Sequence, residues 1–212
     1  MNIALLRNQF DNATKGNHKR MISASTDHFD KLSMVAASDV VVNGFYQVAL
    51  PAFQKYIAKY AEVQTNYNLY QGQTQLFEDE IVLLRSTLIR KWDVIIQNEY
   101  DETSAQYKML LPNGRAPFQN NPYDLRLSSV ASLLASVQSM NNPNLATLAS
   151  NIDNWLQTTK QLRTTQQGTE ASDAILRQEL EQARKDLATA MHLVFFQLCV
   201  HYYANLSKVE TF

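Results

Sequence analysis

The histidines are the residues of this sequence best suited to metal chemistry, and their surroundings test for one kind of metal centre. A carboxylate-bridged metal pair in a helical bundle needs Glu-x-x-His on two helices and a further glutamate on each of the others. The positions three residues before the histidines hold no glutamate; they are Lys15, Ser25, Thr189 and Leu198. His192 and His201 are nine residues apart, which places them on opposite sides of one predicted helix. We therefore expect no metal site and no cofactor.

Acidic side chains and the single thiol do not indicate catalysis either. Two acidic clusters, 78–80 and 179–181, lie near the starts of predicted helices, where carboxylates favour the positive end of the helix dipole. Cys199 lies in an apolar run, which is typical of an inert thiol. The sequence holds no Gly-rich phosphate loop, nucleophile elbow or His-Glu-x-x-His. We expect a non-enzymatic protein with no catalytic residues, and an enzyme with an unrecognised site is the alternative.

The longest predicted loop, residues 111–122, is the first candidate for recognition. It is rich in proline and contains Asn113-Gly114, a composition that argues against a helix. Loops of this length in compact proteins are often functional. A spacer whose aromatic residues fill the core is the alternative to a binding surface. The binding residues expected here are Arg115, Phe118, Tyr123 and Arg126.

An aromatic stripe is the second candidate. Apolar or aromatic residues recur at alternating spacings of four and three from Val42 to Tyr70, which is one face of a long helix. A buried tyrosine hydroxyl needs a hydrogen-bond partner, so this stripe suits a bundle edge better than a dry seam. We expect the central residues, Phe53, Tyr56, Tyr60 and Val63, to pack against a helix bearing Leu84, Leu88 and Trp92. The outer residues, expected to meet water, a ligand or a partner, are Tyr46, Tyr67 and Tyr70.

The third candidate is the apolar run of residues 193–200. A helix that is apolar on nearly every side is either central in a core or covered by a partner. The run therefore predicts a buried central helix or a subunit interface, and the sequence leaves both open.

The elements that would position these candidates are all helices. No segment shows sustained alternation of apolar and polar residues, so no sheet is expected. Gly72 and Gly168 each follow a glutamine at the end of a periodic segment, which predicts helix ends there. Pro51 predicts a kink or a helix start, and Asn142-Pro143 predicts a helix start.

The predicted fold is an all-α, up-and-down four-helix bundle made of two helical hairpins, with one or two extra short helices. Hairpin one covers about residues 45–108, the connecting loop 111–122 and hairpin two about 143–207. A single domain is expected over 25–212, preceded by a flexible, slightly basic tail over 1–24. The two halves look alike, and whether they descend from a duplication stays open.

The composition of the chain argues against some classes of function. The net charge is −1 and only 18% of residues are charged, which argues against nucleic acid and weakens repulsion between copies. No apolar stretch is long enough to span a bilayer, and a cytoplasmic location is expected. We expect a protein that acts through protein contacts and self-associates. The alternative is a module that binds a small apolar or aromatic ligand in a pocket bordered by Tyr56, Tyr60 or Tyr67.

Overall fold

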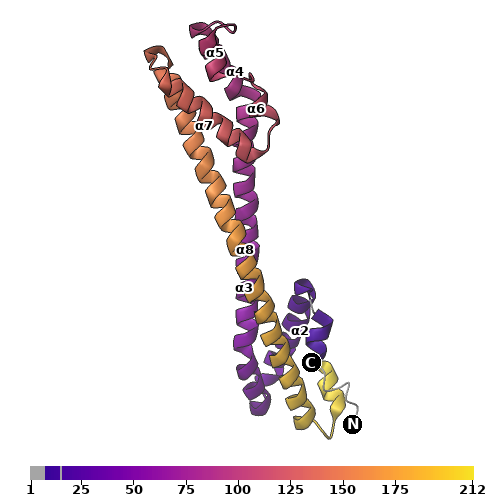
Figure 1. Cartoon of the computed structure of the whole chain (residues 1–212). Coiled ribbons are helices and arrows are strands. Elements are labelled where there is room, and N and C mark those ends of the chain that lie inside the picture. The colour runs from indigo at the N-terminus through magenta and orange to yellow at the C-terminus, as the bar shows by residue number, and fades with distance from the viewer. Residues whose placement is uncertain (1–7, 15) are drawn as a thin grey trace. The chain divides into compact units, whose positions relative to one another are not determined.

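The computed structural model describes residues 8–14 and 16–212, and in this part of the chain every regular element is helical. The predicted all-α helical bundle is therefore confirmed (Figure 1). The elements are α1 (Gln9–Thr14), α2 (His18–Ala36), α3 (Val40–Leu83), the π-helical η2 (Leu84–Leu88), α4 (Ile89–Glu99), α5 (Ala105–Leu110), α6 (Ala116–Asn120), α7 (Tyr123–Ser139), the 3₁₀ helix η3 (Pro143–Leu145), α8 (Ala146–His201) and the 3₁₀ helix η4 (Leu206–Thr211).

Two very long helical runs replace the predicted hairpin turns. The run α3–η2–α4 covers 60 residues and the run η3–α8 covers 59. Gly72 and Gly168 lie inside α3 and α8, so the helix ends predicted at these glycines are wrong. A glycine closes a helix only when it adopts positive φ, and it can equally continue the right-handed ladder. The helix start predicted at Asn142 is confirmed, because its side chain caps η3 with Pro143 in the first turn.

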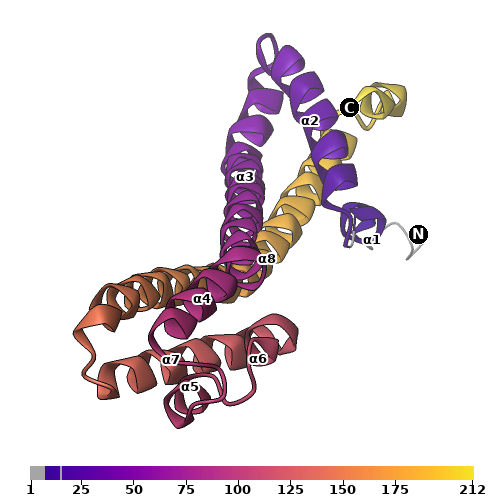
Figure 2. The ribbon, with the colours of Figure 1, turned by 90° about the horizontal axis from the view of Figure 1, so that it is seen from above.

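The chain divides into two compact units, unit 1 (1–68 and 171–212) and unit 2 (69–170), each with its own core. The single domain expected over 25–212 stays a prediction. In unit 2, α7 lies beside the first part of α8 (Figure 2). Large members of the unit 2 core are Phe77, Leu84, Trp92, Val130, Leu148 and Trp155. Large members of the unit 1 core are Met21, Phe29, Tyr56, Leu187, Met191 and Leu198.

In unit 1, α3 and α8 run antiparallel, and α2 packs on one side of the pair. Exposed ion pairs show the direction, since Lys55 contacts Asp186 at 3.0 Å and Lys59 contacts Glu179 at 2.7 Å. Core positions in the aromatic stripe are confirmed in part: Tyr56 and Val63 are buried, whereas Phe53 and Tyr60 are half-buried against the same core. Their expected partner helix is wrong. They pack with residues of α8 such as Leu187, because α3 does not turn back at Gly72.

Three local predictions also change. Pro51 lies on an exposed position inside α3, so the helix does not begin there. The loop 111–122 contains the helix α6, with Pro117 in its first turn, where a missing N–H leaves no orphan donor. The described part of the expected N-terminal tail is helical in α1 and α2, and Met21 is fully buried.

Replacing Gly72 or Gly168 by alanine tests the continuous helices. Both glycines are exposed and a Cβ would meet nothing within 4 Å. Each alanine is therefore expected to stabilise unit 2 by about 0.5–1 kcal/mol. Urea unfolding followed by tryptophan fluorescence reports on this unit, because both tryptophans lie in its core. Gly114, with φ +57°, is the matched control, because alanine at a positive φ should destabilise the protein. Destabilisation by alanine at Gly72 or Gly168 would instead indicate that the helix ends there, as the sequence predicted.

Candidate functional site

The seven predicted binding residues are divided between the two compact units. Tyr46 and Tyr67 belong to unit 1, whereas Tyr70 and the four loop residues belong to unit 2. Tyr46 packs near Phe29, with 6.2 Å between ring centroids, and Tyr67 is exposed. Tyr70 is half-buried. The role of these tyrosines in binding stays a prediction.

The four loop residues are held by contacts within unit 2. Phe118 is buried in the core, which matches the spacer alternative. The Arg115 Nε lies 3.5 Å from an oxygen of the buried Asp93 carboxylate. The Tyr123 ring meets Phe77 edge-on at 5.4 Å, and the Arg126 guanidinium lies 5.7 Å over the Tyr123 ring. Their use in binding stays a prediction.

Asp93 is the polar centre of this region. Its Oδ1 accepts a hydrogen bond from the Tyr107 hydroxyl at 2.7 Å and from the Gln97 amide at 3.1 Å. Burial and the neighbouring Asp93 carboxylate raise the pKa of Tyr107. These contacts join α4 to α5. Together with Arg115 they give the buried Asp93 carboxylate its polar partners, so its burial has a structural explanation and does not require a catalytic role.

Two neighbouring helix segments of unit 1 lack charged residues altogether. Residues 40–54 of α3 and 187–200 of α8 contain no Asp, Glu, Lys or Arg. Since α3 and α8 are antiparallel, the two segments lie side by side. Several large apolar side chains on them are nevertheless exposed: Val41 at 47%, Val48 at 79%, Leu193 at 57% and Val200 at 73%. A helix face in water is normally polar, so this face is unusual.

We use the name α3/α8 face for Val41, Phe45 and Val48 on α3 with Leu193, Phe196 and Val200 on α8. Their spacings of four and three place each trio on one side of its helix. A groove of about 410 Å³ lies on this face. It is lined by Val41, Phe45, Phe196, Gln197, Val200 and His201.

A carboxylate anchors the end of the α3/α8 face. Asp39 caps α3 by accepting hydrogen bonds from the backbone N–H groups of Val41 (2.9 Å) and Val42 (3.1 Å). Its other oxygen accepts from His201 Nε2 at 2.9 Å and from the Tyr202 hydroxyl at 3.1 Å. The His201 hydrogen bond, followed by the backbone donors, lowers the pKa of Asp39 to about 2. This cluster ties the start of α3 to the end of α8.

The chemistry available in the groove is mainly apolar contact. His201 is oriented by Asp39, and its ring lies 6.3 Å from Phe45 in an edge-on arrangement. Of the described residues that line the groove, none is a Ser, Thr or Cys that could act as a nucleophile. Among the described residues, no group of three or more His, Cys, Asp or Glu side chains could hold a metal ion. The arrangement therefore favours binding of an apolar surface.

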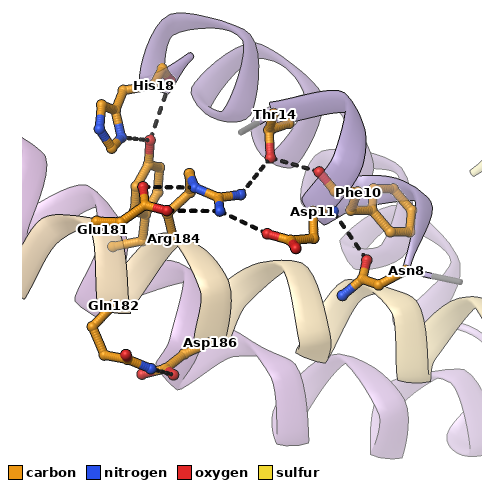
Figure 3. Close-up of polar contacts among 10 residues, drawn as sticks. Asn8, Phe10, Asp11, Thr14, His18, Glu181, Gln182, Arg184 and Asp186 are labelled. Carbon is orange, nitrogen blue, oxygen red and sulfur yellow. Dashed lines mark hydrogen bonds and ion pairs between the residues drawn. The ribbon is translucent and has the colours of Figure 1, made fainter. Parts of the chain in front are cut away.

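A second polar cluster of unit 1 gathers around Arg184 (Figure 3). Arg184 is fully buried. Its guanidinium pairs with Glu181 on α8 and with Asp11 on α1. Beside it, the Tyr56 hydroxyl donates to the backbone oxygen of His18 at 3.2 Å. Burial lowers the pKa of His18, and the Arg184 hydrogen bonds lower the pKa of Glu181.

Sequence reasoning found half of the α3/α8 face. The apolar run 193–200 predicts the α8 half, whereas the stretch 40–54 carries its signal in its missing charges and not in its tyrosines. The signal for the whole face is that both stretches lack charged residues and would lie side by side if their helices were antiparallel. The Arg184 cluster carried no local signal, since Asp11 and Arg184 lie far apart in the sequence.

Comparisons with known protein families, with curated proteins and with solved structures each found no match. In the described part of the chain, no helix is both long and apolar enough to cross a membrane. The inference of function therefore rests on the residues of this chain.

Replacing Asp39 by asparagine tests the anchor. Asparagine keeps the cap but loses the charge that faces His201. A carboxyl group whose folded pKa of about 2 is below its ordinary 3.8 stabilises the fold above that ordinary value, and the effect is lost as pH falls towards 2. The difference in unfolding free energy between wild type and D39N should therefore be larger at about pH 6 than at about pH 2.5.

Urea unfolding followed by circular dichroism at the two pH values measures this difference. Asp27→Asn is the matched control, because the Asp27 carboxylate is exposed and pairs with an exposed lysine on the same helix. An equal difference for D39N at both pH values would show that the carboxylate does not stabilise unit 1 through its charge.

Proposed function

We propose that this protein acts through protein contacts, and that the α3/α8 face binds the same face of a second copy. The observation that carries the proposal is the exposed apolar face on two paired segments without charged residues. Exposing Val48, Leu193 and Val200 to water is unfavourable, at about 25 cal/mol per Å² of apolar surface. Covering the face removes this cost.

The geometry of the face suits a second copy. A twofold axis through it would set one α3–α8 pair against another, which is the packing of four helices. Such a contact is isologous, so any charged residue near its centre would face the same charge on the other copy. The absence of charged residues from both segments and the net charge of −1 avoid this repulsion.

A small apolar ligand is the second candidate, and the groove favours it. Its volume of about 410 Å³ falls in the range of ligand pockets, about 300–1,000 Å³. The groove lies beside Phe45 and His201, whereas the sequence predicted a pocket bordered by Tyr56, Tyr60 or Tyr67. Tyr56 is instead fully buried in the core.

Replacing Val200 by glutamate tests the proposal. In a twofold contact it places two carboxylates in an apolar interface, so self-association should weaken by about tenfold or more. Light scattering across a concentration series is the measurement, and wild type is expected to approach a dimer as concentration rises. Ile175→Glu is the matched control, because Ile175 is 61% exposed on α8 but lies outside the face.

Two outcomes would contradict the second copy as the occupant. The first is a wild type that remains a strict monomer at every concentration, and the second is an equal weakening of association by the Val200 and Ile175 variants. A monomer whose groove binds an apolar fluorescent dye, with the binding lost in V200E, would instead support the ligand candidate.

A further inference from the structure

Among the described residues of unit 1, the largest fully buried side chain is a cation, Arg184. The Arg184 side chain on α8 is only 1% exposed. Burying a guanidinium is costly unless its N–H groups find acceptors. Glu181, one turn earlier on α8, supplies two of them, since its oxygens accept from Nε and Nη2 at 2.9 Å each. This forked pair neutralises Arg184 within its own helix.

The remaining acceptors come from α1 (Figure 3). Asp11 Oδ1 accepts from Arg184 Nη2 at 2.6 Å, and Thr14 Oγ1 accepts from Nη1 at 2.9 Å. Phe10, next to the carboxylate, lies 6.0 Å from the His28 ring on α2. Among the α1 side chains that the structure describes, an aromatic residue, a carboxylate next to it and a hydroxyl three residues after the carboxylate make these contacts.

The helix α1 depends on this contact for its order. It has six residues, and isolated helices of that length are unstable in water. A turn at Gly16, with φ +67°, connects it to α2, which Asn17 caps by accepting a hydrogen bond from the Arg20 N–H. A short helix that folds only where it docks, on a tether, behaves as an intramolecular ligand.

When α1 leaves its site, the Arg184 guanidinium is not left without an ion-pair partner. Arg184 would lose Asp11 and Thr14 but keep both oxygens of Glu181. The Asp11 side chain is 41% exposed even when docked, so solvent already screens its attraction to Arg184. Local opening of α1 should therefore cost much less than unfolding of unit 1.

We propose that the Arg184 cluster is a docking site for a short acidic helix, occupied within the chain by α1 and able to accept a segment of the same chemistry from another chain. That segment presents an aromatic residue, a carboxylate next to it and a hydroxyl three residues after the carboxylate. The carboxylate pairs with Arg184 and the hydroxyl accepts from its Nη1. The proposal is independent of the α3/α8 face, because it concerns the side of unit 1 covered by α1.

The test uses the full chain and a labelled peptide of residues 8–14. In Asp11→Lys, the chain's own α1 carries a cation towards Arg184 and should leave the site open. Fluorescence anisotropy should show the peptide binding to D11K at least tenfold more tightly than to wild type. The same peptide with Asp11→Asn should bind D11K at least tenfold more weakly. Asp27→Lys, an acid replaced on α2, is the matched control and should behave as wild type.

The proposal is overturned if D11K keeps its helicity and binds neither peptide, or binds both equally. A second measurement on wild type covers the case in which D11K fails to fold. Native-state hydrogen exchange should show the amides of residues 11–14 opening at a rate insensitive to low urea, whereas the amides of Met191 and Leu198 open only with global unfolding. Exchange of both sets through global unfolding alone would rule out a detachable α1.

Discussion

The antiparallel packing of α3 on α8 is the contact on which unit 1 depends. The ion pairs across it are exposed, and pairs of that kind contribute about 0–1 kcal/mol each. Burial of apolar side chains such as Leu187, Met191 and Leu198 contributes more, about 1.5–3 kcal/mol for each. The same pairing brings Asp39 to His201 and sets Val41 beside Val200 in one groove. Both proposed binding surfaces are thus consequences of one helix pair.

The two surfaces differ in how their side chains are satisfied. Around Arg184, the polar groups meet partners inside the chain, and α1 completes the set. On the α3/α8 face, large apolar groups remain in water, and Val48 and Val200 stay largely exposed among the residues that the structure describes. A satisfied site can bind another molecule only by exchange with its own segment, whereas an unsatisfied face can bind directly. This difference is why the α3/α8 face carries the proposed function and the Arg184 cluster a separate inference.

Local sequence patterns predicted the helices and the cap at Asn142, because periodicity and capping act between near neighbours. They failed at Gly72 and Gly168, where glycine suits a helix interior as well as a helix end. Because of that error, Tyr56 was predicted to pack against the helix bearing Trp92, whereas in the structure it packs against α8. The contact of Asp11 with Arg184, like that of Asp39 with His201, joins distant parts of the chain, and no local pattern predicts it. The apolar run 193–200 was predicted to be either a buried central helix or a subunit interface. Val194 and Leu198 are buried, as the first alternative requires, whereas Leu193 and Val200 are exposed, and the interface stays a prediction.

The central claim, that the α3/α8 face meets its copy, is tested most directly by a distance between copies. Gln197 is exposed and lines the groove, and Cys199 is the only cysteine. With Cys199→Ser and Gln197→Cys, each chain carries one spin label, so any measured dipolar distance must join two chains. The account predicts a short, narrow distance distribution at high concentration that disappears on dilution with unlabelled protein. Absence of dipolar coupling at concentrations where light scattering detects association would place the contact elsewhere and contradict the account.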